Sequence, residues 1–216
     1  MSIATVEHAF VDTDAQARAL ADAVAARLRE GIAARGGAWL VVPGGTTPRK
    51  FLAALARQAL DWPRVTVILT DERLVPADDA RSNERMLREV LIAPTQARFV
   101  PLQSGVPRPF DAVVLGMGAD GHCASLFADG DNIGAALRVD TVESVLNMRS
   151  PSVPEARVTL TLSALISTRA LFVLIRGAEK RRTLESALRG VEPFAQAPIR
   201  AVLEHAPVAP QVYWCP

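Results

Sequence analysis

Runs of apolar residues alternate along this chain with segments whose apolar positions recur at helical spacing. Buried-strand patterns cover residues 38–42, 65–69, 111–115 and 170–175, and residues 157–162 alternate like a half-buried strand. Helical patterns cover residues 14–34, 47–60, 83–92 and 177–188. This alternation is typical of βαβ units, in which helices cover both faces of a parallel sheet. The pattern therefore predicts an α/β fold.

Turn-forming residues set the expected boundaries of these elements. Gly36 and Gly37 stop the first helix, and Thr47 with Pro48 reads as the N-cap and first residue of the next one. Residues 71–81 read as a polar loop and residues 149–154 as a second loop, whereas residues 202–216 give no clear pattern.

Composition narrows the kinds of protein this chain can be. Its 216 residues are 50% hydrophobic with a mean hydropathy of +0.18, enough for one sizeable α/β domain over residues 1–216. The net charge of +1 gives no sign of nucleic-acid binding, and two cysteines are too few for a disulfide framework. No apolar run has spanning length and no secretory segment is recognisable. We expect a cytoplasmic protein that uses neither membrane nor nucleic acid.

The segment from Gly116 to His122 carries the strongest functional signal. It places three glycines, Asp120 and His122 directly after the apolar run 111–115. Open α/β sheets bind ligands at the carboxyl ends of their strands, and glycine lets the backbone approach a ligand closely. Histidine titrates near neutral pH, so this turn predicts an active-site loop, with a structurally satisfied histidine as the alternative.

Two further strand ends carry polar residues. Gly44, Gly45 and Thr46 lie between a strand and a helix, where free backbone N–H groups can cradle a phosphate, although a plain tight turn explains them as well. Arg73 follows the next strand and can clamp a phosphate or carboxylate, although a solvated charge run is the alternative. Both signals are weak when taken alone.

Taken together, the polar segments resemble the 6-phosphogluconolactonase family. The resemblance rests on five blocks in the family's order: residues 44–48, residues 71–76 with 78–79 and 82–83, residues 116–127, residues 157–161 and residues 177–180. It implies a modified doubly wound, mostly parallel sheet with helices on both faces, as in glucosamine-6-phosphate deaminases and ribose-5-phosphate isomerases. It also implies hydrolysis of 6-phosphoglucono-δ-lactone to 6-phosphogluconate in the pentose phosphate pathway.

The resemblance also implies roles for individual residues. A δ-lactone is an activated ester, so its hydrolysis needs a positioned water, a base and oxyanion donors, but no obligatory metal or cofactor. His122 is the expected general base, and Asp120 either orients the imidazole or is structural. Asn83 is expected to support the Arg73 loop. The residues expected to bind the phosphate and the rest of the substrate are Gly44, Gly45, Thr46, Arg73, Arg157 and Lys180.

Three positions depart from the family pattern. Pro43 stands where serine is common, which removes a hydroxyl and a backbone N–H from the entrance of the phosphate loop. Cys123 stands where threonine is common, and Ala128 where proline usually follows. We expect Cys123 to be a small, buried, unreactive residue at the start of a helix, because adjacent side chains do not aim at one another.

Two other functions remain open on the sequence. A glucosamine-6-phosphate deaminase resembles this chain in its phosphate loop, but its Phe-Asn-Glu-Pro segment is replaced here by residues 125–128, which lack the carboxylate. A nonenzymatic sugar-phosphate sensor would not need His122, and the chain shows no DNA-reading module. The expected partner is a small phosphorylated sugar lactone, bound by a monomer or small homo-oligomer.

Overall fold

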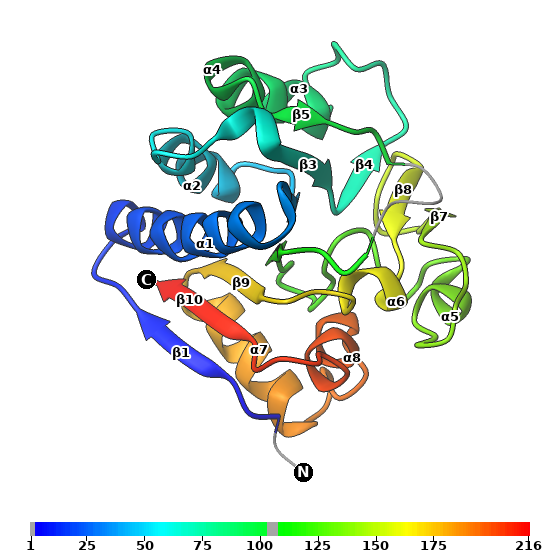
Figure 1. Cartoon of the computed structure of the whole chain (residues 1–216). Helices are drawn as coiled ribbons and strands as arrows, with labels where there is room; N and C mark the ends of the chain where they lie inside the picture. The colour runs from blue at the N-terminus through cyan, green and yellow to red at the C-terminus, as the bar shows by residue number, and fades with distance from the viewer. Residues whose placement is uncertain (1–2, 103–107) are drawn as a thin grey trace.

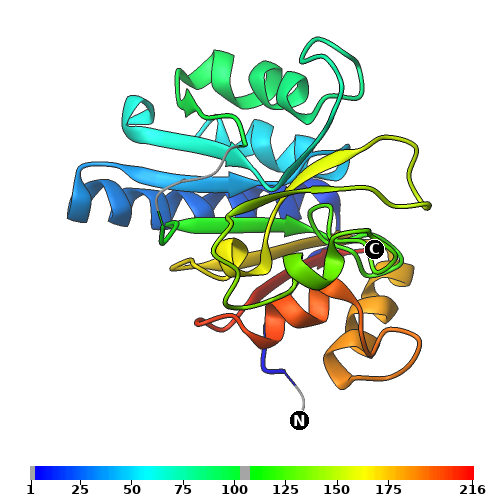
Figure 2. The same cartoon turned by 90° about the vertical axis from the view of Figure 1, so that its right-hand side faces the viewer.

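A parallel sheet of seven strands forms the centre of the computed structural model, which describes residues 3–102 and 108–216 (Figure 1). Every neighbouring pair in this sheet is parallel, and Figure 2 shows its strands running side by side. In sheet order the strands are β1 (Val6–Ala9), β10 (Gln211–Cys215), β9 (Leu171–Arg176), β6 (Ala112–Gly116), β2 (Ala38–Val42), β3 (Val65–Leu69) and β5 (Arg98–Phe99).

The order of the strands makes the sheet doubly wound. From β2 the chain moves outward through β3 to β5, then returns to β6 on the other side of β2 and moves outward through β9 to β10. The predicted fold class is therefore confirmed, and strand order reverses between β2 and β6. Ligands of such sheets bind outside the carboxyl ends of the strands at this reversal.

Helices cover both faces of the sheet, with α1 and α2 on one side and α7 and α8 on the other (Figure 1). The first layer comprises α1 (Thr13–Arg35), α2 (Thr47–Leu55), α3 (Asn83–Leu87), the π-helical turn η2 (Arg88–Ile92) and α4 (Ala93–Thr95), and the 3₁₀ turn η1 (Trp62–Arg64) precedes β3. The second face carries α5 (Ile133–Ala136), α6 (Leu162–Leu165), α7 (Ala178–Arg189) and α8 (Pro198–Glu204).

The alternation of side chains along the buried strands produces two hydrophobic cores. Leu40 and Val42 of β2 point into the core under α1 and α2, whereas Val41 points into the core under α7 and α8. Val114 of β6 likewise faces the first core, and Val113 the second. Because both faces are buried, these strands appear in the sequence as continuous apolar runs.

A second sheet of three antiparallel strands stands beside the carboxyl ends of the main sheet. Its order is β4 (Asp71–Arg73), β8 (Arg157–Leu160) and β7 (Val145–Met148). The expectation of a loop over residues 71–81 was wrong for its first three residues. A strand of three charged residues shows no periodicity, and its partner β8 lies far along the chain.

Element boundaries were predicted with mixed success. Gly36 ends α1 in the left-handed conformation (φ 76°), as expected. Helix α2 begins one residue earlier than expected, because Thr46 is the N-cap, and it ends at Leu55 rather than near residue 60. Strands β1 and β10 were not anticipated. None of the helices in the described part of the chain is long and apolar enough to cross a membrane. The extent of the single domain stays a prediction.

Candidate active site

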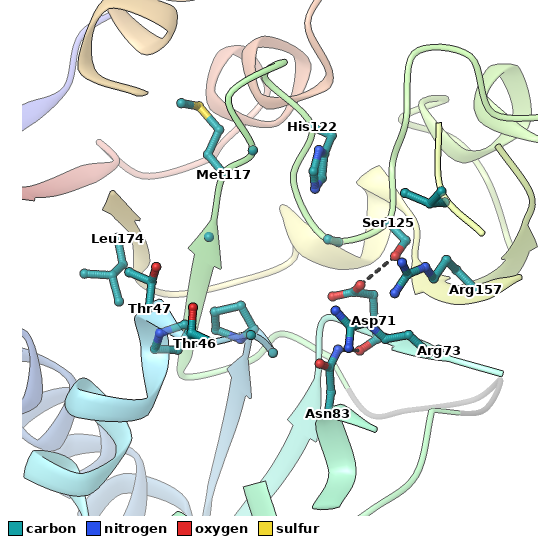
Figure 3. Close-up of a pocket in the computed structure, with 18 of the residues that line it drawn as sticks. Thr46, Thr47, Asp71, Arg73, Asn83, Met117, His122, Ser125, Arg157 and Leu174 are labelled. Atoms are coloured by element: carbon teal, nitrogen blue, oxygen red, sulfur yellow. Dashed lines mark hydrogen bonds between the residues drawn. The ribbon is translucent and has the colours of Figure 1, made fainter. Parts of the chain in front are cut away.

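A pocket of about 360 Å³ lies at the carboxyl ends of β2, β3, β6 and β9, where the strand order reverses (Figure 3). The loops after these strands build its walls, together with β8 and the first turn of α7. Seven of the eight residues predicted for the site line it: Gly44, Gly45, Thr46, Arg73, His122, Arg157 and Lys180. Asp120 lies behind His122 and does not line the pocket.

The loop after β2 brings backbone and hydroxyl donors to one wall. Gly45 adopts a positive φ of 92°, and a side chain at Gly44 would collide with the amide of Asn83. The Thr46 hydroxyl makes no capping hydrogen bond to α2, and Figure 3 shows it with Thr47 at the edge of the pocket. A helix N-terminus with free N–H groups and an uncommitted hydroxyl suits a phosphate.

Two arginines form the opposite wall. Arg73 of β4 and Arg157 of β8 are directly paired across the antiparallel strands, and both line the pocket. Arg157 is 7% exposed, and its Nε has no hydrogen-bond partner among the residues described. Burial, and then the neighbouring Arg73, lower the pKa of Arg157. Like charges held this close favour an anion between them.

The loop after β6 holds the histidine. The Nδ1 atom of His122 lies 2.6 Å from Oδ1 of Asp120, and the backbone N–H of His122 donates to the same oxygen at 3.3 Å. Gly118 makes this possible, because a Cβ there would collide with both side chains. The hydrogen bond from His122 lowers the pKa of Asp120. With Nδ1 engaged by the carboxylate, Nε2 of the ring remains for the pocket.

Asp71 and Ser125 were not predicted as site residues. The Ser125 hydroxyl donates to Oδ2 of Asp71 at 2.6 Å, and both residues line the pocket (Figure 3). The Thr70 hydroxyl donates to Oδ1 of Asp71 at 2.7 Å. Asp71 and Ser125 stand inside segments that carry the family resemblance, but the sequence gives no sign that these distant segments touch. Asp71 is the one carboxylate in the described lining of the pocket.

Asn83 connects two of these loops. Its side-chain amide donates to the carbonyl oxygen of Asp71 at 3.0 Å, and its backbone N–H donates to Oε1 of Glu72 at 2.9 Å. The same side chain packs under Gly44. Asn83 thus supports the β4 segment, as expected. It also packs against the loop at Gly44 and so holds that loop in position.

Cys123 is fully buried, and burial raises the pKa of its thiol. The expected helix after the Asp-Gly-His turn is absent, which corrects the sequence interpretation. Cys123 instead forms an isolated β-bridge with Leu126, whose N–H donates to the Cys123 carbonyl at 3.0 Å. Ala124 has a positive φ of 49°, a backbone conformation that a right-handed helix does not contain.

The described residues contain no group of three or more His, Cys, Asp or Glu side chains that fits a metal ion. The site instead offers hydrogen-bond donors, cations and one histidine paired with a carboxylate. Such a set can bind an anionic substrate and move a proton.

Comparison with known proteins assigns the family. The model for glucosamine-6-phosphate isomerases/6-phosphogluconolactonase matches residues 11–109 and 102–214. The chain belongs to this family. It is 41% identical to a 6-phosphogluconolactonase from Rhizobium meliloti (strain 1021), over 97% of this chain and 98% of the relative. It is also 41% identical to a Pseudomonas putida 6-phosphogluconolactonase, over 97% and 92% of the two chains.

Solved structures agree with this assignment. A 6-phosphogluconolactonase from Shewanella baltica superposes with a TM-score of 0.91 at 35% identity, covering 100% of both chains. A monomeric glucosamine-6-phosphate deaminase superposes with a TM-score of 0.72 at 16% identity, over 98% of this chain and 97% of the deaminase. The second likeness shows a shared fold.

Proposed function

We propose that this protein is a 6-phosphogluconolactonase, which hydrolyses 6-phospho-D-glucono-1,5-lactone to 6-phospho-D-gluconate in the oxidative pentose phosphate pathway. The observation that carries the proposal is the His122–Asp120 pair, joined at 2.6 Å, at the edge of a pocket whose other walls supply cations. The names of the curated relatives support the substrate and the pathway.

The phosphate binds away from the histidine. Arg73 and Arg157 offer two guanidinium groups from paired positions of β4 and β8, and Lys180 adds an ammonium group from α7. Gly45 and Thr46 add donors at the start of α2. An anion on these groups leaves the lactone ring between them and His122, with C1 toward the imidazole.

The reaction proceeds by general-base catalysis. Nε2 of His122 takes a proton from a water molecule, and the water oxygen adds to the carbonyl carbon C1 of the lactone. The tetrahedral oxyanion then re-forms the C1 carbonyl, the bond between C1 and the ring oxygen breaks, and the proton held by His122 passes to that oxygen. A positioned base of this kind contributes about 10²–10⁴-fold in rate.

Asp120 orients the base in this mechanism. Its carboxylate accepts the hydrogen bond from Nδ1, which leaves the lone pair on Nε2, and it stabilises the imidazolium formed after proton transfer. The lowered pKa of Asp120 keeps its carboxylate charged at neutral pH. The hydrogen-bond partner of His122 therefore keeps the same charge across the neutral pH range.

The cellular setting forms part of the proposal. Both cysteines are free and buried, as in proteins of a reducing compartment, which supports a cytoplasmic enzyme. We propose that it acts as a monomer or small homo-oligomer on a small substrate, without nucleic acid, membrane, metal or cofactor.

Turnover of two substrates tests the proposal. The purified protein should hydrolyse 6-phosphogluconolactone well above the spontaneous rate, and it should release no ammonia from glucosamine 6-phosphate. Lactone hydrolysis at no more than the spontaneous rate would refute the proposal. Deamination of glucosamine 6-phosphate would instead favour a glucosamine-6-phosphate deaminase.

A further inference from the structure

A second cavity lies at the opposite edge of the central sheet, where the parallel strands begin. It measures about 410 Å³, somewhat more than the candidate active site, and is lined by the turn after α1, by Trp39 and by a group of arginines. The arginines of this cavity, here called the amino-edge cluster, are Arg35, Arg64, Arg98, Arg108 and Arg169.

The amino-edge cluster follows the order of the strands. Each arginine stands at the first residue of a strand or shortly before one, and the five strands concerned are consecutive neighbours in the sheet. In sheet order the pairs are Arg169 with β9, Arg108 with β6, Arg35 with β2, Arg64 with β3 and Arg98 with β5. Since neighbouring strands lie about 4.8 Å apart, the sheet itself sets these cations side by side.

Few carboxylates balance this charge. Asp111 is the one acid in the described lining of the cavity, and it is shared by Arg35, which hydrogen-bonds to it, and by Arg169, whose Nε lies 4.0 Å from Oδ1. Arg64 pairs with Asp61 at 2.9 Å. The lining carries five arginines and one aspartate, a net charge of +4, in a chain whose total is +1.

Two members of the cluster have no acidic partner in the part of the chain that the structure describes. Within residues 3–102 and 108–216, no carboxylate lies within 4.0 Å of Arg98 or Arg108, and both side chains are exposed. Among the described residues, the Nη1 of Arg108 has one hydrogen-bond partner, the Ser163 hydroxyl, at 3.5 Å. Arg35 stands in the last turn of α1, where a cation offsets the partial negative charge of the carboxyl end of the helix. That role does not account for the other four arginines.

We propose that this cavity binds a small anion carrying at least two phosphate groups, separately from the active site. Guanidinium groups suit phosphate because their N–H donors match its oxygens in pairs. The cavity volume lies in the range of small-molecule sites, and the exposed guanidinium groups of Arg98 and Arg108 are free to supply the contacts. Asp111, buried and bonded to the Trp39 N–H at 2.8 Å, holds Arg35 in place beside them.

Calorimetric titration with inorganic pyrophosphate and with magnesium-free ATP tests the proposal. The variant Arg98→Ala/Arg108→Ala should weaken binding of both probes by about tenfold or more, because it removes two charged donors. The control Arg27→Ala/Arg138→Ala removes two exposed arginines elsewhere and the same charge, so it should bind within about twofold of the unaltered protein. Tighter binding of ATP than of pyrophosphate would show that the site also contacts the nucleoside. Equal binding would show that it contacts the phosphate groups alone.

Amide spectra locate the binding independently of the variants. The N–H signals of Gly36 and Gly37, which line this cavity, should shift with pyrophosphate. Shifts confined to Gly44 and Gly45 would place the anion in the active site and overturn the proposal, as would equal loss of affinity in the control variant. Lactone hydrolysis by Arg98→Ala/Arg108→Ala should be unchanged, so this result does not depend on the proposed function.

Discussion

Arg73 and Arg157 stand directly opposite one another on β4 and β8, and both reach the same pocket. Two guanidinium groups at paired positions repel each other, and Arg157 is also largely buried. Glu155 offsets part of this repulsion, at 3.5 Å from Arg157, and a phosphate bound between the two guanidinium groups, as we propose, would offset more of it. The small antiparallel sheet therefore serves to hold two cations at the carboxyl edge of the main sheet.

Arg73→Ala should weaken substrate binding more than it slows the chemical step. Loss of one charge-assisted contact costs about 1.5–3 kcal/mol, or roughly 10–150-fold in kcat/KM for the phosphorylated lactone. The preference for 6-phosphogluconolactone over unphosphorylated gluconolactone should shrink by the same factor. An unchanged preference would refute the phosphate assignment, and Arg27→Ala on the outer face of α1 provides the control.

His122→Ala should lose about 10²–10⁴-fold in kcat, because the proposed base is gone, while 6-phosphogluconate still binds through the cations on the other walls. His205→Ala is the matched control, since His205 is exposed, its Nδ1 lies 2.9 Å from the Ala201 carbonyl oxygen, and it is not among the described residues that line the pocket. Steady-state kinetics and calorimetric binding of the product separate the two effects. Near-normal turnover by His122→Ala would remove it as the base.

Gly118→Ala should damage the site although it replaces no reactive side chain. The new methyl group would collide with the imidazole of His122 and the carboxylate of Asp120, so the pair must separate. We expect a loss of about 1–3 kcal/mol in unfolding free energy and a clear fall in kcat. Gly134→Ala, in a helix with open space around it, should keep full activity and gain about 0.5–1 kcal/mol. Full activity in Gly118→Ala would contradict the role of the pair.

Cys123 should take no part in the chemistry. Burial raises the pKa of its thiol, so the thiolate stays scarce in the folded protein from pH 7 to about 9, and alkylation becomes measurable only when the chain unfolds. Cys123→Ser, once shown to be folded, should hydrolyse the lactone at close to the normal rate. A trapped thioester on Cys123, or a folded variant that binds substrate without turnover, would mean that water is not the nucleophile.

The sequence was sufficient for the four inner strands of the central sheet and for most of the pocket lining, but not for the outer strands β1, β10 and β5. Strands buried on both faces are continuous apolar runs, so β2, β3, β6 and β9 could be recognised from the pattern of apolar residues. The carboxyl ends of parallel strands meet at one edge, which explains why Gly44, Arg73 and His122 were expected together. Their roles remain predictions.

Long-range contacts and short irregular elements could not be predicted. The hydrogen bond between Ser125 and Asp71 joins distant segments, and nothing local marks either residue as a partner. The helix expected after His122 does not form, because Ala124 has a positive φ, a conformation that the local preference of alanine does not predict. Strand β4 exists only because β8 pairs with it.

A crystal structure with 6-phosphogluconate bound would show directly whether the cations and His122 act on one substrate. We expect the phosphate within hydrogen-bond distance of Arg73 and Arg157, close to the Gly44–Thr46 loop, and the C1 carboxylate beside Nε2 of His122. A phosphate bound far from these groups, or a product carboxylate pointing away from His122, would contradict this expectation.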